Sequence, residues 1–125
     1  MSLSEYLASI RTEIERLDSF GFSESIDVRE ETRAGKQAII SVDVVLINGA
    51  VLLIREYIDA RYAIEKVSYA YHFQGKDGNL IFRYDNAAHK PALDFSGHKH
   101  TAEGHVIQAP SPGMRGLLDE VISYL

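Results

Sequence analysis

The sequence predicts an α+β protein: a twisted antiparallel β-sheet of about five to six strands in meander order, with N-terminal and C-terminal helices packed on it. Three observations predict this class. Apolar residues recur at helical spacing near both ends of the chain. Between them, strand-like segments follow one another. Short, turn-forming connections join these segments, which favours antiparallel pairing. The length of 125 residues suits a single domain over residues 1–125.

The first segment has the pattern of an amphipathic helix that covers one side of a sheet. Ser2 and Glu5 predict a capping box at its start, and Gly21 predicts its end. Its apolar face consists of Leu3, Leu7, Ile10, Ile14 and Leu17.

The middle of the chain reads as consecutive strands. Asn48-Gly49 and Asp77-Gly78 each predict a tight hairpin. After residue 86 the pattern breaks up, with at most one or two short strands before residue 108. We expect Ser111 to cap a second helix that begins at Pro112. The predicted strands cover residues 25–32, 37–47, 50–59, 63–73 and 80–86.

The first hairpin predicts which side chains of its two strands meet. A two-residue turn at Asn48-Gly49 places Ser41 opposite Glu56 and Asp43 opposite Ile54. On that register the core face of the returning strand carries Val51 and Leu53 and is interrupted by Arg55.

The second hairpin places His72 opposite Arg83 and Ala70 opposite Asp85, with Tyr71 facing Tyr84 on the other side. One face of the sheet would then collect the polar residues His72, Arg83 and Asp85. In a simple meander, Glu56 and Asp43 would lie near them.

The composition excludes several classes of protein. The chain has no cysteine, which removes disulfides, thiolate metal sites and thiol nucleophiles. No apolar run approaches the roughly 20 residues of a membrane helix, so no membrane partner is expected. Without a signal segment at the start, a cytoplasmic location is expected. The net charge of −5 argues against a protein that simply coats nucleic acid. All five histidines, however, lie within residues 72–108.

The residues best suited to chemistry lie between Arg83 and His100. In an extended segment His98 and His100 point the same way and Lys99 the other. Two histidines can act as base and acid, and cations can hold a phosphate, which suits metal-free cleavage of RNA by its 2′-hydroxyl. The candidate catalytic residues are His98, His100, Lys99, Arg83, Asp85 and His89. The candidate substrate-binding residues are His72, Gln74, Tyr84, Asn86 and Glu56.

Other interpretations of the same residues stay open. His98, His100, His89 and Asp85 could bind a divalent metal, as in a metal-dependent hydrolase. Arg83 and Asp85 could form a structural ion pair, and a polar sheet face could belong to a non-enzymatic protein-binding module. A homodimer is a further alternative that the sequence leaves open.

A longer string of residues resembles a known family. Tyr71-His72-Phe73-Gln74, then Phe82 to Ala87, His89 and His98-Lys99-His100, resemble the TumE-like toxins over about residues 50 to 105. The chain departs from the family pattern at Ala88 and at Ser96-Gly97.

The resemblance implies a small toxin of a type II toxin–antitoxin pair, inhibited by a separate antitoxin protein. It also fits a metal-independent endoribonuclease with an RNA substrate and no cofactor. On this hypothesis His98 and His100 form the acid–base pair, while Arg83 and Lys99 bind the phosphate.

Overall fold

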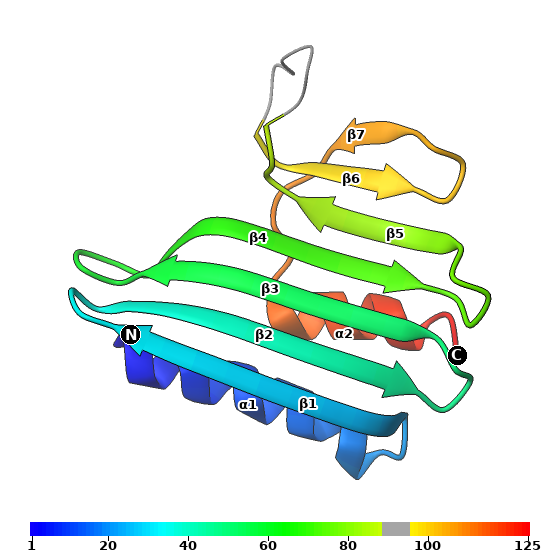
Figure 1. The fold of residues 1–125 in the computed structure, drawn as a ribbon, viewed down its shortest axis with the longest axis horizontal. Helices are drawn as coiled ribbons and strands as arrows, with labels where there is room; N and C mark the ends of the chain where they lie inside the picture. Colours follow the sequence, from blue (N-terminus) through cyan, green and yellow to red (C-terminus); the bar gives the residue numbers. More distant parts are fainter. Residues whose placement is uncertain (89–95) are drawn as a thin grey trace.

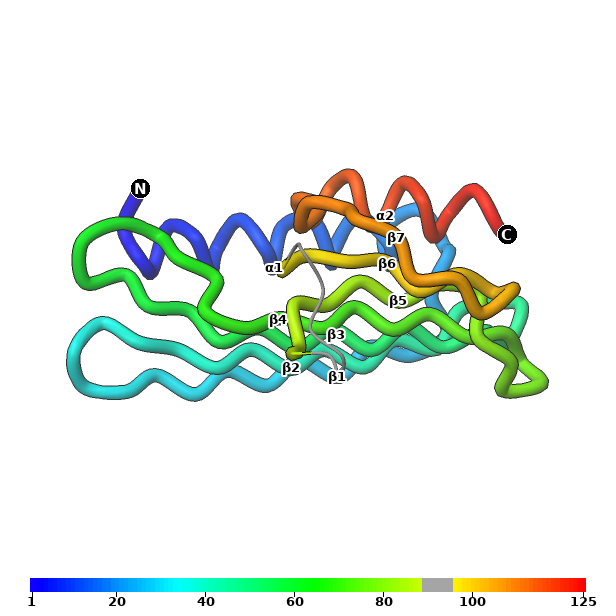
Figure 2. The backbone as a smooth tube through the Cα atoms, turned by 90° about the horizontal axis from the view of Figure 1, so that it is seen from above, coloured from blue at the N-terminus to red at the C-terminus, as the bar shows by residue number. Residues whose placement is uncertain are grey.

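The computed structural model describes residues 1–88 and 96–125, which form one antiparallel sheet and two helices (Figure 1). The described sheet has seven strands that pair in chain order. Both helices cover the same face of it (Figure 2). The elements are α1 (Leu3–Ser19), β1 (Ser23–Arg33), β2 (Gln37–Leu46), β3 (Val51–Asp59), β4 (Glu65–Gln74), β5 (Leu80–Asp85), β6 (His98–Thr101), β7 (Val106–Gln108) and α2 (Met114–Ile122).

The predicted α+β class and the meander order are confirmed, but the sheet has more strands than predicted. Both β6 and β7, with 4 and 3 residues, lie in the region where the sequence predicts at most one or two short strands without placing them. Their sequences are too short and too polar to show the alternation that reveals a strand. Pairing with β5 is what orders them, and this pairing brings the histidine segment into the sheet.

The start of α1 follows the prediction. The Ser2 hydroxyl accepts a hydrogen bond from the Glu5 amide at 3.1 Å, and the Ser2 amide donates to Glu5 Oε1 at 3.0 Å. Gly21 adopts a left-handed φ of 74° just beyond the helix end. Leu7, Ile10, Ile14 and Leu17 are buried against the sheet.

The predicted start of the second helix is wrong. The helix begins at Met114 with Gly113 as N-cap, and Ser111 does not cap it. The Lys66 ammonium instead donates to the Ser111 hydroxyl at 2.7 Å and to the Pro112 carbonyl at 3.1 Å. These two bonds tie the segment to β4 and engage the Ser111 hydroxyl away from the helix start.

The predicted register of β2 and β3 is also wrong, by one residue. Asp43 lies opposite Leu53, and Ser41 lies opposite Arg55. The reason is a three-residue loop, closed by the Leu46 amide on the Ala50 carbonyl at 2.8 Å, with Gly49 at φ 85°.

This shift exchanges the two faces of β3. Leu52, Ile54, Glu56 and Ile58 turn toward the helices and are buried. The residues predicted for the core, Val51 and Leu53, lie on the opposite face with Arg55. We call this second face, which neither helix covers, the open face.

The predicted register of β4 and β5 is confirmed: His72 pairs with Arg83, Ala70 with Asp85 and Tyr71 with Tyr84. The core fills the space between the sheet and the two helices. Its largest side chains on these strands are Tyr71, Phe73 and Phe82.

Candidate functional site

Strands β4, β5 and β6 bring five polar residues together on the open face. His72 lies opposite Arg83, which lies opposite His100, so the three form one row across the strands. In the next row, Asp85 lies opposite His98. His98 and His100 therefore share a face, as the spacing predicts.

Asp85 is the centre of this cluster. Its Oδ1 lies 2.5 Å from Nε2 of His98, and its Oδ2 accepts a hydrogen bond from Arg83 Nε at 2.8 Å. Nε2 of His100 lies 3.4 Å from the same Oδ2. The Ala87 amide also donates to Oδ1, at 3.2 Å. One carboxylate thus orients side chains from two strands and the start of the following loop.

Asp85 is charged at neutral pH. Burial by itself raises the pKa of this carboxyl, since the residue is only 4% exposed. The hydrogen bonds from Arg83 and Ala87 and the charges of His98 and His100 outweigh burial, so the pKa of Asp85 lies below its ordinary value.

The contacts of His72 specify its tautomer. Arg83 Nη1 lies 3.2 Å from His72 Nδ1, and a guanidinium can only donate. Nδ1 must therefore be the unprotonated nitrogen. Nε2 then carries the proton and donates it to Gln74 Oε1 at 2.9 Å. This arrangement needs the neutral imidazole.

The side chains of the cluster differ in their access to solvent. Those of Arg83 and His100 are 38% and 25% exposed, so both can meet a ligand. His98 is 1% exposed and lies against Asp85. The rings of His98 and His100 meet edge to face, with centroids 5.4 Å apart.

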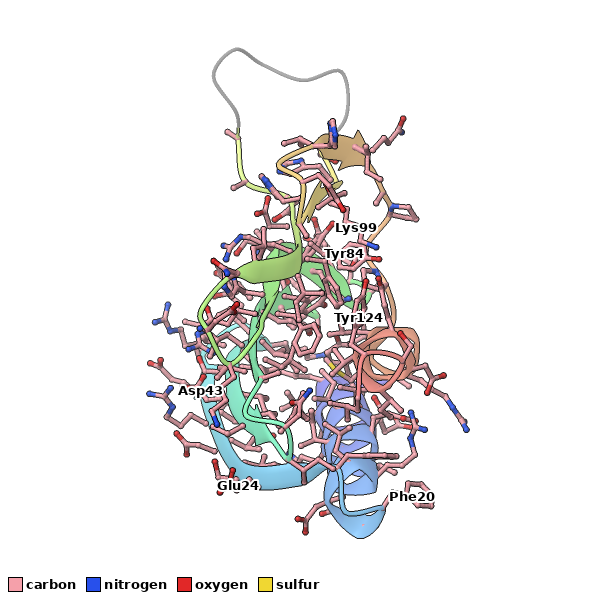
Figure 3. All side chains as sticks on the ribbon, turned by 90° about the vertical axis from the view of Figure 1, so that its right-hand side faces the viewer. Phe20, Glu24, Asp43, Tyr84, Lys99 and Tyr124 are labelled. Atoms are coloured by element: carbon pink, nitrogen blue, oxygen red, sulfur yellow. The ribbon has the colours of Figure 1, made fainter. Side chains whose placement is uncertain are left out.

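Two predicted site residues lie on the other side of the sheet. Lys99 and Tyr84 point toward α2, away from the open face on which Asp43 lies (Figure 3). Lys99 Nζ lies 2.7 Å from Oε2 of Glu120, and the Tyr84 hydroxyl donates to Oε1 of Glu120 at 2.7 Å. The structure therefore separates Lys99 from Arg83 by the thickness of the sheet.

Glu56 is also outside the cluster, because the register shift turns it into the core. It accepts hydrogen bonds from the hydroxyls of Tyr6 and Tyr71, and Lys66 Nζ lies 3.7 Å away. Burial, and then the charge of Glu56, raise the pKa of both tyrosines. Burial lowers the pKa of Lys66 despite the opposing effect of Glu56. These residues connect α1, β3 and β4.

Asn86 is bonded to the backbone of β4. Its amide donates to the Val67 carbonyl at 3.0 Å and accepts from the Tyr69 amide at 3.1 Å. It therefore holds the end of β5 in place. The remaining predicted residue, His89, lies outside the described residues.

Beside the cluster lies a groove, and the sequence interpretation did not predict this groove. It has a volume of about 490 Å³ and shares Arg83 and Asp85 with the cluster. Arg55 and Tyr57 of β3 form its opposite side. Sequence reasoning could not place these two residues here, because the predicted register put Arg55 on the core face.

The donor atoms of Asp85, His98 and His100 lie within 4.8 Å of one another, close enough to surround a cation. Two histidines and a carboxylate are a set that divalent transition metals accept. Arg83, however, already donates to Asp85 Oδ2, and its positive charge beside that oxygen opposes a metal ion there.

Comparison with known proteins decides the family. The model of the Toxin TumE family matches residues 11–125, from within α1 to the last residue. The chain belongs to this family. The match confirms the resemblance seen in the sequence and extends it over the second part of α1, every described strand and α2 of this TumE-family chain. Searches among curated proteins and among solved structures returned no match. No described helix has the length and apolar character needed to span a bilayer.

Proposed function

We propose that this chain is the toxin of a toxin–antitoxin pair and that it cleaves RNA without a metal, with His72 and His100 as base and acid. The family match supports the toxin component and an antitoxin protein as partner. The observation that carries the reaction is the row His72–Arg83–His100, in which a guanidinium lies between two imidazoles on the open face.

The protonation states suit the two roles. His72 is held as the neutral imidazole, the form that can accept a proton. The Asp85 carboxylate, 3.4 Å from His100, stabilises the imidazolium form of that residue, which can donate one. Arg83 supplies the positive charge that a pentacoordinate phosphate needs.

Each step of the phosphodiester cleavage can then be assigned to a side chain of the row. A phosphate that takes the Arg83 hydrogen bond releases Nδ1 of His72. Nδ1 takes the proton of the ribose 2′-hydroxyl, whose oxygen attacks the neighbouring phosphorus. His100 donates its proton to the departing 5′-oxygen, and the products are a 2′,3′-cyclic phosphate and a 5′-hydroxyl. The 2′-hydroxyl restricts the reaction to RNA.

His98 has a different role in this proposal from the one predicted. With 1% exposure it does not reach a substrate, so we assign it as a positioning residue that acts through Asp85. Lys99, bonded to Glu120 on the helix side, is assigned to holding β6 against α2 and not to the phosphate.

The test is cleavage of labelled RNA by purified variants, together with growth inhibition on expression. His100→Ala, His72→Ala and Arg83→Ala should each lower kcat by about 10²- to 10⁴-fold. His105→Ala is the matched control, because this exposed histidine lies in the turn between β6 and β7. Cleavage by the double variant of His72 and His100 at the wild-type rate would contradict the proposal.

The cluster of Asp85, His98 and His100 supports a second candidate, a metal-dependent hydrolase. The two candidates differ in their response to a chelator. Activity that survives EDTA supports the metal-free reaction. Activity that EDTA removes, and that one divalent ion per chain restores, would favour the metal site instead.

A further inference from the structure

We infer that the groove beside Arg83 binds a nucleobase of single-stranded RNA, next to the phosphate that is cleaved. The inference rests on the proposed ribonuclease function, which it extends from the reaction to the form of the substrate. It is carried by the shape of the groove, by its lining and by its continuity with the row His72–Arg83–His100.

The groove exists because β4 presents small side chains between larger ones. Ala70 lies between Arg55 of β3 and Asp85 of β5 in one row of the sheet. Ser68 lies opposite Tyr57 one row further along. A bulge follows at this point, where the register between β3 and β4 shifts. Because the side chains of Ala70 and Ser68 are short and those beside them are long, a groove of about 490 Å³ remains between the longer side chains.

This volume suits a small organic ring system, since ligand pockets commonly span about 300–1,000 Å³. The wall formed by Tyr57 is an aromatic ring whose hydroxyl donates to Gln37 Oε1 at 3.0 Å. That bond orients the ring, which lines the groove. Bases stack on such rings with little dependence on their identity.

Arg55 gives the groove a guanidinium in a fixed position. Its Nη1 lies 2.8 Å from Asp43 Oδ1 and donates to the Ile54 carbonyl at 2.8 Å, so the planar guanidinium is held in place. The groove thus has a guanidinium at each end, that of Arg55 paired with Asp43 and that of Arg83 paired with Asp85. A negatively charged backbone can follow this path while its base enters between them.

Single-stranded RNA is the form that fits. A base can enter the groove only after it leaves the stack, and a base in a duplex is paired and stacked on both sides. Successive rows of the open face are roughly 7 Å apart, which places the groove within one nucleotide of Arg83.

The experiment compares two groove variants with a matched control. Ala70→Leu fills the floor, Tyr57→Ala removes the stacking wall, and Tyr62→Ala removes an exposed tyrosine outside the groove. Each purified protein is given a short single-stranded oligoribonucleotide, the same strand in a duplex, and the strand with an abasic ribose next to the cleaved phosphate. Circular dichroism checks that each variant is folded.

We expect both groove variants to lower kcat/KM for the intact single strand about tenfold. Tyr62→Ala should leave it unchanged. The abasic strand should be cleaved alike by all proteins, and the duplex poorly by all. Groove variants that cleave the intact strand as fast as the wild type overturn the inference, while loss of cleavage in His100→Ala still supports the ribonuclease.

A binding measurement separates the two proposals if the wild type cleaves no RNA. Fluorescence anisotropy of the labelled single strand is then measured with His100→Ala, alone and combined with Ala70→Leu. Weaker binding by the combined variant supports the groove even though the proposed reaction has failed. Equal binding, or no binding by either protein, overturns the inference.

Discussion

Nε2 of His98 lies 2.5 Å from Oδ1 of Asp85, and both side chains are buried on the open face of the sheet. The contact joins β5 to the polar strand β6, which has little apolar surface of its own. It also places the carboxylate where Arg83 and His100 reach it. Stability and the arrangement of the proposed site therefore depend on the same pair.

The first prediction concerns this pair. His98→Ala should lower the free energy of unfolding by about 3 kcal/mol, because it removes one partner of a buried charge. RNA cleavage should also fall, and His98→Gln, which can still donate an N–H to Asp85, should restore part of it. Urea unfolding and cleavage rates measure the two effects. A His98→Ala protein as stable as His105→Ala would contradict the assigned role.

The second prediction concerns stability in acid. The pKa of Asp85 is lower in the folded protein than its ordinary value of 3.8, so the unfolded chain binds a proton more readily. The stabilising contribution of this carboxylate is therefore complete above that value and is lost as the pH falls through the folded pKa. Urea midpoints measured from neutral pH down to about pH 2 should drop less steeply for Asp85→Asn than for the wild type. Parallel curves would show that Asp85 does not contribute in this way.

The third prediction separates Lys99 from Arg83. Lys99→Ala should change RNA cleavage by less than about threefold, because Lys99 is bonded to Glu120 on the helix side. Its effect on stability should be at most about 1 kcal/mol, since the ion pair is partly exposed. Arg83→Lys, which keeps the charge and loses the planar guanidinium, should lower cleavage about 10²-fold. Equal losses in the two variants would place Lys99 at the phosphate.

The fourth prediction concerns Glu56. Glu56→Ala should destabilise the protein by about 3–5 kcal/mol, because it leaves two tyrosine hydroxyls without their acceptor and the buried Lys66 ammonium without its counter-ion. Glu56→Gln keeps an acceptor oxygen and should cost less. Cleavage per folded molecule should be unchanged in Glu56→Gln, which a rate measurement corrected for the folded fraction can show. A selective loss of cleavage in this variant would return Glu56 to the substrate site.

Local patterns in the sequence account for much of this structure. The period of the apolar residues marks the two helices and the longer strands, and Ser2 and Glu5 mark the start of α1. Asp77-Gly78 is enough to predict the pairing of His72 with Arg83. Strand alternation predicts that His98 and His100 share a face. Each of these features depends on residues that are close together in the chain.

Contacts between distant segments decided the rest. Asn48-Gly49 allows both a two-residue and a three-residue loop, and the packing of β3 under the helices selects the second, which buries Glu56. The presence of α2 on one face draws Lys99 and Tyr84 to Glu120. The sequence by itself determined the fold class, the register of β4 with β5 and the residue types of the site. Tertiary structure decided which of those residues meet, because a side chain's partners depend on the strand beside it and on the element that covers its face.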